Sequence, residues 1–375
     1  MSSLRKTLPV FVTGASGFIG GQLAARLLAD GRKVRVLSRR PLPELQKRGA
    51  EVIIGDLDAP AALQRGCDFA ETVFHVAGRV GVWGPAEDFF HVNVEGTRRV
   101  LAACRKAGVP RLVYTSSPSV VYTGGDLRNV DESAPLCTRA PCAYPTSKAV
   151  AEMLVLAAHD RNFSTVALRP HLVWGPGDKN VVPRVLALAR AGKLKIIGSG
   201  RNKVDVTHIT NVVDAHLLAE GALITPQLPT LAPQKRDEWG ASPAGASRAA
   251  SPPQRDNAQP ALPPAGGKAY FITNGEPVVL WDWINELLRG VGVPEIKARV
   301  PLPVAYAAGG LLEAAWHLFG RSGEPPMTRF VAKEMATDHW FDLTAARRDL
   351  GYVPQVTVAA GTAELIAHYK AGNAF

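Results

Sequence analysis

Tyr144 and Lys148 are the two residues whose types and spacing point most directly to chemistry. Residues four apart lie on the same face of a helix, and Pro145 is tolerated between them because it falls in the first helical turn. A phenol titrates at about 10, which is too high for efficient proton transfer at neutral pH. An ammonium group beside it favours the phenolate and lowers that pKa. The pair is therefore suited to exchanging a proton with the oxygen of a ketone or alcohol during hydride transfer.

The segment Tyr114-Thr115-Ser116-Ser117 supplies hydroxyl groups that can hold a substrate oxygen beside the tyrosine. It ends a short apolar run, 111–115, that we expect to be a strand, and ligands of parallel sheets bind at the carboxyl ends of strands. A tyrosine and a lysine at this spacing also occur together by chance. Here they are informative because they follow a glycine-rich loop and this serine-bearing strand in the chain.

The glycine-rich loop Thr13-Gly14-Ala15-Ser16-Gly17-Phe18-Ile19-Gly20 lies between the first expected strand and the first expected helix. Gly14 permits a tight turn, Gly17 lets a pyrophosphate approach the backbone, and Gly20 lets the helix pack against the sheet. The N-terminus of the helix offers free N–H groups and a favourable dipole to phosphates. Such a loop can also be a turn without a ligand, but the strand before it and the helix after it favour dinucleotide binding.

The end of the second expected strand indicates which dinucleotide is bound. An acidic residue there would bind the ribose 2′-hydroxyl, whereas the chain reads Val36-Leu37-Ser38-Arg39-Arg40. Arg39 is either simply exposed to solvent or paired with a 2′-phosphate through its planar set of donors. We therefore favour NADP(H) as the cofactor and leave NAD(H) open. Asp56, after the third expected strand, is a candidate to bind adenine or a cap of its own loop.

Short apolar runs alternate with amphipathic stretches through the first half of the chain. Strands are expected at 9–13, 33–37, 52–54, 72–76, 111–115 and 165–168, and helices near 19–27, 94–107 and from Tyr144 onward. This alternation predicts an α/β fold with a doubly wound parallel sheet of the Rossmann type, followed by a smaller C-terminal substrate-binding domain. We place the dinucleotide-binding domain at 8–175, with returning segments near 204–223 and 268–274, and the substrate-binding domain mainly at 176–375.

Two later segments have unusual compositions. Residues 226–267 are rich in proline, small residues and charge, and Trp239 is their only aromatic residue. So few apolar side chains cannot offset the entropy of ordering, and we expect a disordered insert. Residues 301–320 are mostly apolar, but glycines and charge interrupt them, which makes a membrane span a poor interpretation. We rank a buried helix first, a hydrophobic lid over a substrate second and an interfacial contact third.

Composition narrows the class of protein. The chain of 375 residues is 46% hydrophobic and 20% charged, as globular proteins are. Its formal charge of +10 suits anionic partners such as dinucleotide phosphates. The basic residues are scattered and carry no nucleic-acid signature, so no nucleic-acid partner is expected. Few cysteines and an N-terminus without an apolar leader indicate a cytoplasmic protein.

No metal site is expected, because the four cysteines form no Cys-x-x-Cys pair and no His-Glu-x-x-His is present. The histidines His75, His91, His171 and His208 lack the spacing of metal ligands, and we interpret them as structural or substrate-lining. Trp83 either walls the substrate cavity or packs within its own loop.

Together these motifs resemble the extended short-chain dehydrogenases/reductases. The resemblance is carried by the glycine-rich loop, the Tyr144 and Lys148 pair, the serine-bearing strand end, His75-Val76-Ala77-Gly78 and Asn93-Val94-Glu95-Gly96-Thr97. Within that group, the second half is similar to the 3β-hydroxysteroid dehydrogenase branch, which includes sterol-4-carboxylate 3-dehydrogenases and 2-alkyl-3-oxoalkanoate reductases. This closer match is carried by Arg169-Pro170-His171-Leu172-Val173-Trp174-Gly175-Pro176-Gly177-Asp178 and Gly323-Glu324-Pro325-Pro326.

The resemblance implies roles for individual residues. Ser117, Tyr144 and Lys148 would be catalytic, with Ser116 as a neighbouring candidate and Lys148 also touching the nicotinamide ribose. The cofactor would be bound by Gly14, Ser16, Gly17, Phe18, Ile19, Gly20, Arg39, Asp56, Leu57, Val76, Ala77, Gly78, Pro170 and Leu172. The family often forms dimers, so a homodimer is expected by analogy alone.

Three functions compete on such a scaffold. We favour an NAD(P)-dependent dehydrogenase or reductase acting on the 3-hydroxy or 3-oxo group of a small but bulky apolar substrate, a sterol or a 2-alkyl-3-oxoalkanoate, because 301–320 can bury hydrocarbon. A nucleotide-sugar epimerase is the alternative, whereas dehydration is disfavoured because Pro118-Ser119 replaces the Asp-Glu of related dehydratases. A non-enzymatic, cofactor-sensing subunit would not need the intact Tyr144 and Lys148 pair.

Overall fold

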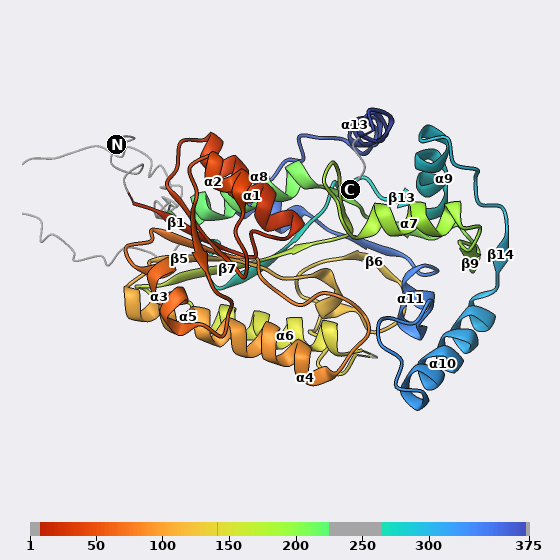
Figure 1. Ribbon diagram of the computed structural model, residues 1–375, viewed down its shortest axis with the longest axis horizontal. Helices are drawn as coiled ribbons and strands as arrows, with labels where there is room; N and C mark the ends of the chain where they lie inside the picture. The colour runs from red at the N-terminus through yellow and green to blue at the C-terminus, as the bar shows by residue number, and fades with distance from the viewer. Residues whose placement is uncertain (1–7, 141, 225–263, 373–375) are drawn as a thin grey trace, which may run out of the picture.

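The computed structural model describes residues 8–140, 142–224 and 264–372, and its centre is a sheet of seven parallel strands (Figure 1). The strand order is β12-β7-β5-β4-β1-β2-β3. The strands are β1 (Val10–Thr13), β2 (Val34–Ser38), β3 (Glu51–Ile54), β4 (Thr72–His75), β5 (Arg111–Thr115), β7 (Ser164–Pro170) and β12 (Lys268–Ile272). The direction of winding reverses between β1 and β4, and doubly wound sheets bind ligands at this point. The predicted Rossmann-type fold is confirmed.

Helices cover both faces of this sheet, because its central strands are apolar on both sides. On one face lie α1 (Phe18–Ala29), α2 (Pro43–Lys47) and α8 (Ile209–Ile224), and on the other α3 (Pro60–Cys67), α5 (Gly96–Ala107) and α6 (Ala143–Ala157) (Figure 1). The chain enters α5 through α4 (Ala86–Phe89) and a π-helical turn, Phe90–Glu95. A π-helical turn inside a helix is rare and often marks a functional position.

A second lobe lies at one end of the sheet (Figure 1). It holds a four-stranded sheet of β6 (Leu127–Val130), β10 (Lys203–Val204), β13 (Val278–Val279) and β15 (His339–Phe341), and the pairs β8 (Val173–Trp174) with β11 (Thr207–His208) and β9 (Ile196–Ile197) with β14 (Arg299–Val300). Its helices are α7 (Val181–Arg190), α9 (Leu280–Gly290), α10 (Leu302–Leu318), α11 (Arg329–Glu334) and α13 (Val358–Lys370). Their apolar faces meet in a separate core around Trp174, Trp281 and Trp283.

The two lobes exchange segments along the chain. The strand β6 comes from the first half but pairs with β15 in the second lobe. Conversely, α8 and β12 come from the second half and complete the seven-stranded sheet and its cover, and α12 (Thr344–Leu350) packs on α8. The limits 8–175 and 176–375 remain our proposal for the two domains.

One expectation for the apolar segment 301–320 is wrong. The segment forms α10, but only Ala305 and Gly309 are buried in this helix, so the first-ranked interpretation, a buried helix, does not hold. Large apolar side chains of the segment face solvent, including Leu311 at 74% and Leu318 at 79% exposure. Hydropathy predicted a helix correctly but did not predict which surface would cover it.

Most of the predicted insert, 226–267, lies outside the described residues. Its last four residues, 264–267, are described and form a turn in which Ala265 is buried. The Gly267 N–H donates to the Thr165 carbonyl over 2.7 Å. These four residues therefore have a defined structure, contrary to the disorder that we expected of them.

Candidate active site

A cavity of about 1610 Å³ opens beyond the carboxyl ends of β1, β4, β5 and β7 and extends into the second lobe. We call it the main cavity. It exceeds the roughly 300–1,000 Å³ of a site for one small ligand, so it has room for a dinucleotide and a substrate together. All the predicted site residues except Gly20 line it, namely Gly14, Ser16, Gly17, Phe18, Ile19, Arg39, Asp56, Leu57, Val76, Ala77, Gly78, Ser116, Ser117, Tyr144, Lys148, Pro170 and Leu172.

The glycine-rich loop has the close contacts that its glycines permit. Gly14 has a φ of +76°, and a Cβ there would lie 2.6 Å from the Ala77 nitrogen. Gly20 lies beneath the cavity, where a Cβ would meet the Gly14 carbonyl oxygen. The helix α1 begins after Gly17 without a side-chain cap and without an acidic residue in its first turn. Its free N–H groups and positive dipole end therefore face the cavity, and both fit a pyrophosphate.

The ends of β2 and β3 form the far wall of the main cavity. Arg39 follows β2, is exposed and lines this wall, and β2 ends in Ser38-Arg39-Arg40 without an acidic residue. A guanidinium in this place fits the 2′-phosphate of a dinucleotide, because it offers a planar set of donors. Asp56 accepts a hydrogen bond from the Asp58 N–H at 3.0 Å while also lining the cavity. The capping role that we considered for Asp56 is therefore present.

Asn93, in the π-helical turn, joins the segment after β4 to the helix that carries Tyr144 and Lys148. The oxygen of its side-chain amide accepts from the Arg79 N–H at 2.7 Å, and the nitrogen of that amide donates to the Ser147 hydroxyl at 2.9 Å. Ser147 in turn donates to the Tyr144 carbonyl at 2.8 Å. Asn93 is buried, so these bonds hold the first turn of α6 at a fixed place beside β4. The sequence marked the 93–97 segment, but we had assigned Asn93 no role.

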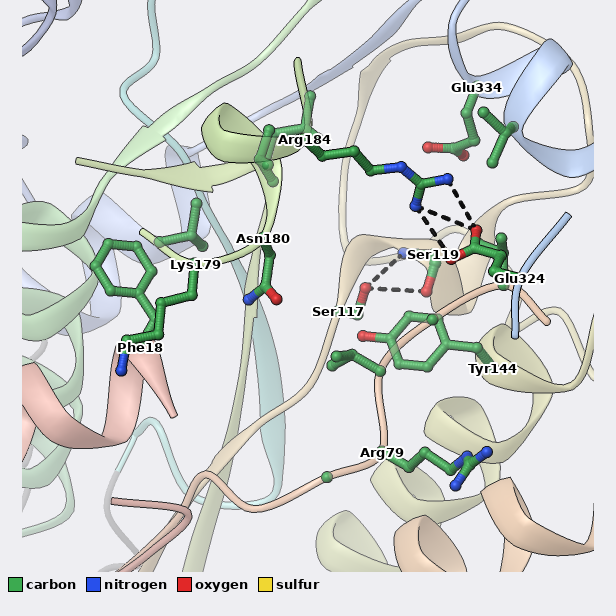
Figure 2. Close-up of a pocket in the computed structure, with 18 of the residues that line it drawn as sticks. Phe18, Arg79, Ser117, Ser119, Tyr144, Lys179, Asn180, Arg184, Glu324 and Glu334 are labelled. Atoms are coloured by element: carbon green, nitrogen blue, oxygen red, sulfur yellow. Dashed lines mark hydrogen bonds and ion pairs between the residues drawn. The ribbon is translucent and has the colours of Figure 1, made fainter. Parts of the chain in front are cut away.

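The hydroxyl groups of Tyr144 and Ser117 point toward one another across the cavity (Figure 2). Ser117 follows β5, and Tyr144 lies in the first turn of α6. The Ser117 hydroxyl also contacts the Ser119 hydroxyl at 2.9 Å. Ser116 lines the cavity too, but its hydroxyl is buried and has no hydrogen-bond partner among the described residues. The geometry therefore favours Ser117 over Ser116 as the partner of Tyr144, and Ser119 is an orienting residue that the sequence analysis missed.

Lys148 lies one turn along α6 and is 5% exposed. Its ammonium donates to the Thr115 carbonyl over 2.6 Å and lies 4.3 Å from the centre of the Tyr114 ring. Burial lowers the pKa of Lys148 to about 7, although the Glu152 carboxylate acts in the opposite direction. Glu152 itself forms a buried ion pair with Arg169 at 2.6 Å.

Burial raises the pKa of Tyr144 above its ordinary value, and the Ser117 hydroxyl opposes this shift. We expected Lys148 to lower this pKa, and for the protein without ligands that expectation is wrong. Desolvation penalises the charged form of each group, so it favours a neutral phenol and weakens the ammonium. A neutral phenol is the form that can give a proton to a ketone.

The turn after β7 also borders the site. Pro170 ends that strand, and Leu172 has a φ of +39°, a backbone conformation that is strained for a leucine. The Leu172 carbonyl accepts from the Thr207 N–H at 3.2 Å, which holds this turn against β11. His171 also lines the cavity, and burial lowers its pKa to about 3, so it stays neutral.

The other histidines and Trp83 can now be placed. His75 is fully buried and bonds the hydroxyls of Thr13 and Thr97 at 2.8 and 3.0 Å, a structural role. His91 lines the main cavity, and Trp83 lines a neighbouring one, where its ring is tilted by 50° to that of His317 with 4.7 Å between the ring centres. Within the described ranges, no group of three His, Cys, Asp or Glu side chains gathers as a metal ion would require.

The second lobe adds charged residues to which the sequence analysis gave no role. Arg184 on α7 forms an ion pair with Glu324 at 3.1 Å, above Ser117 and Tyr144 (Figure 2). Glu334 ends α11 on the same wall, and burial raises the pKa of its carboxyl group. These three residues lie far apart in the chain without regular spacing, so nothing local in the sequence could have grouped them. Between them the wall is apolar, with Ile197, Val300 and Phe330 among its residues.

Comparison with known proteins places this site in a family. A model of the 3-beta hydroxysteroid dehydrogenase/isomerase family matches residues 11–235. The chain belongs to this family. A 2-alkyl-3-oxoalkanoate reductase of Stenotrophomonas maltophilia is 40% identical over 363 residues, which are 96% of this chain and 99% of that protein. The decarboxylating sterol-4-alpha-carboxylate 3-dehydrogenase of Bos taurus is 32% identical over 352 residues, which are 92% and 88% of the two chains.

Solved structures agree with this fold. MoeE5 in complex with UDP-glucose and NAD matches with a TM-score of 0.66 at 25% identity, over 98% of this chain and all of that one. A dTDP-glucose 4,6-dehydratase of Bacillus anthracis in complex with NAD also has a TM-score of 0.66, at 17% identity, over 97% of each chain. The second likeness shows the fold alone. With its family and site, the chain is an NAD(P)-dependent oxidoreductase that interconverts a hydroxyl group and a ketone.

Proposed function

We propose that the protein is an NADPH-dependent reductase of 2-alkyl-3-oxoalkanoates. One observation carries the proposal: the facing hydroxyls of Tyr144 and Ser117 lie in a cavity that begins at a phosphate-binding loop and also holds apolar side chains and basic ones, Arg184 and several lysines. Such a cavity suits a ketone flanked by hydrocarbon and a carboxylate. The sequence similarity to a reductase of that name, at 40% identity, supports the same substrate class.

The cofactor is held by groups that fit its parts. The uncapped start of α1 and the close approach allowed by Gly14 fit the pyrophosphate, and Arg39 fits a 2′-phosphate. We infer NADP(H) rather than NAD(H) from Arg39 and from the absence of an acidic residue at the end of β2. When bound, the reduced nicotinamide supplies the hydride. Pro170, Leu172, Val76, Ala77 and Gly78 would surround its ring and ribose.

The protein's own residues handle the oxygen of the substrate. Ser117 donates a hydrogen bond to the ketone oxygen and holds it beside Tyr144, and Ser119 orients Ser117. Tyr144 gives its proton to that oxygen as negative charge develops on it. Its raised pKa keeps the phenol protonated at neutral pH, which suits reduction. Lys148 would bind the ribose and favour the phenolate that remains.

The carboxylate of the substrate would meet Arg184. This guanidinium is half-exposed and has Glu324 as its partner, itself 31% exposed. A substrate carboxylate can join or replace Glu324, because arginine offers several donors in one plane. Burial raises the pKa of the Glu334 carboxyl group, which favours its neutral form and so weakens its repulsion of the anion.

Other expectations remain predictions. None of the helices in the described part of the chain combines the length and hydropathy needed to cross a bilayer. The exposed side chains of Val304, Leu311 and Leu318 on α10, together with neighbouring Phe319, suit a contact with a lipid interface. The homodimer and the cytoplasmic location are likewise predicted from resemblance and composition.

The deciding experiment measures oxidation of NADPH and of NADH with a freshly prepared 2-alkyl-3-oxoalkanoate. Comparators are its methyl ester, which lacks the charge, a 3-oxosteroid and a UDP-sugar. We expect NADPH-linked reduction of the acid, with a higher KM for the ester. Faster reduction of the steroid would contradict the substrate class. Conversion of the UDP-sugar without net oxidation would instead indicate the epimerase alternative.

A further inference from the structure

A second cavity, of about 790 Å³, adjoins the main cavity beside Tyr144. We call it the aromatic cavity, because Trp83, Phe89, Tyr122, Tyr306, Trp316 and Phe330 line it. Val82, Tyr122 and Phe330 line both cavities, so the two share a wall. Its volume lies within the roughly 300–1,000 Å³ typical of small-ligand sites.

The aromatic cavity lies against the first turn of α6. Cys142 and Ala143, the two residues before Tyr144, are part of its lining. Phe89 on its wall lies edge-on to the Tyr144 ring, with 6.5 Å between the ring centres. Tyr144 itself lines the main cavity, so the ketone site lies beside the wall that the two cavities share.

The charged groups around this cavity already have partners within the protein. Arg329 is paired with Glu313 at 2.7 Å, and the Lys333 ammonium lies 5.4 Å from the centre of the Tyr306 ring. The Arg321 guanidinium lies 5.0 Å from that of Trp316. Arg321 lies over the Trp316 ring and Arg79 over the Phe89 ring, whereas Phe330 and Val82 supply apolar wall for hydrocarbon.

The helix α10 borders both cavities. Ala305 and Ala308 line the main cavity, whereas Tyr306, Trp316 and His317 line the aromatic cavity. This helix therefore contributes to the walls of both cavities, and a separate hydrocarbon chain would lie against it in each. A sterol presents a rigid fused-ring system next to its reacting carbon, whereas a 2-alkyl-3-oxoalkanoate carries two flexible chains there, one on C2 and another on C3.

We infer that the aromatic cavity is the binding site for one of the two hydrocarbon chains of a 2-alkyl-3-oxoalkanoate, while the other chain occupies the apolar end of the main cavity. The inference rests on the proposed function and adds a site to it. Binding in two cavities selects doubly chained acids over singly chained ones. Each methylene group buried in the aromatic cavity raises kcat/KM about fourfold.

The test fills the aromatic cavity from its open side. Ala86 lines it and is exposed, at the start of α4, so Ala86→Trp places an indole there without entering the core. Ala307→Trp is the matched control, because Ala307 is exposed on α10 and lines neither cavity. Three acids are compared: one with two long chains, one with a methyl group on C2, and one with a methyl group on C3.

We expect Ala86→Trp to lower kcat/KM about tenfold or more for the acid with two long chains, since two or more methylene groups are displaced. For one of the two shortened acids it changes kcat/KM less than about twofold, and that acid identifies the chain that enters the aromatic cavity. Ala307→Trp leaves all three values unchanged. Equal effects of Ala86→Trp on all three acids, or no effect, overturn the inference.

A measurement on the unaltered protein keeps the test independent of folding of the variant. If kcat/KM rises with the length of one chain and does not change with the length of the other, a second chain site is absent. If the protein reduces none of the three acids, the proposed function itself fails. Reduction of all three acids without selectivity for chain length would contradict the two-cavity inference and leave the proposed function intact.

Discussion

Burial acts in opposite directions on Tyr144 and Lys148, because protonated tyrosine is neutral and protonated lysine is charged. Desolvation raises the pKa of Tyr144 and lowers that of Lys148 to about 7. The protein without ligands therefore holds a phenol that is ready to donate a proton.

Tyr144→Phe removes the proposed proton donor and keeps the aromatic ring that packs against Phe89. We expect turnover to fall roughly 10²–10⁴-fold, the usual contribution of general acid catalysis. Affinity for NADPH, measured by fluorescence titration, should stay nearly unchanged. Tyr270→Phe is a matched control, because its hydroxyl bonds Asp349 at 2.8 Å and Tyr270 does not line the cavity. Normal turnover in Tyr144→Phe would rule out the mechanism.

Lys148 also predicts how stability depends on pH. Its folded pKa of about 7 lies below the ordinary 10.5, so between these values the unfolded chain holds a proton that the folded chain has lost. The free energy of unfolding therefore rises with pH in this window, and below about 7 the contribution becomes constant. Lys148→Met removes the contribution, so its free energy of unfolding should rise less steeply.

Urea denaturation of the ligand-free protein at several pH values from 7 to 9 measures this difference in slope. The upper limit avoids the titration of Tyr144, whose raised pKa acts with the opposite sign at higher pH. Lys106→Met serves as the control, because Lys106 is exposed on α5. Identical slopes for the original chain and Lys148→Met would mean that Lys148 keeps its ordinary pKa.

Individual residues were predictable where the chemistry is local. The glycine-rich loop, Tyr144 and Lys148 were found because a turn or a single helical face brings each set together. Arg184, Glu324 and Glu334 were given no role, since three distant segments meet only in the folded chain. The direction of the Tyr144 pKa shift was also missed, because burial depends on the whole site and not on the neighbouring lysine alone.

At the scale of elements, α10 depends on a close contact with the start of α11. A Cβ on Gly309 would lie 2.8 Å from the Arg329 nitrogen and from the Thr328 carbonyl carbon. A Cβ on the adjacent Gly310 would instead lie 3.4 Å from a side-chain carbon of Arg329, an ordinary contact. The two neighbouring glycines of α10 thus differ in whether a Cβ fits without a shift of the neighbouring backbone.

Gly309→Ala should destabilise the protein by about 1–3 kcal/mol, because backbone atoms of α11 must move. Gly310→Ala should be neutral or stabilising by up to about 1 kcal/mol, because alanine favours the helix. Thermal unfolding of the two variants side by side measures the difference. A loss of stability in Gly310→Ala equal to that in Gly309→Ala would show that the contact between α10 and α11 is not close.

The elements of the parallel sheet were predictable from sequence because their cores are formed by short apolar runs of fixed length. The strands expected at 111–115 and 165–168 appear as β5 and β7. The second lobe was harder to predict, since its strands are as short as two residues and pair across the chain. Their partners are set by tertiary packing, which no local pattern records.

At the scale of the whole molecule, one hydrophobic core joins the Rossmann sheet to the second lobe. It runs from Val10 and Val12 in β1 to Phe330 and Phe341, which line the main cavity. The rings of Phe271 on β12 and Phe341 on β15 stack with 4.3 Å between their centres. Separate unfolding of the lobes would expose this shared surface to water, which opposes it.

We therefore expect a single calorimetric transition for the ligand-free protein, with equal calorimetric and van't Hoff enthalpies. NADPH at about 100 times its Kd should stabilise the folded chain by about 2.7 kcal/mol, which corresponds to a rise of about 4 °C in Tm. Because the core is shared, the whole transition should move with the cofactor even though the proposed cofactor site belongs mainly to the first lobe. Two transitions of which only one moves would show that the lobes unfold independently, and the second lobe would then respond to substrate alone.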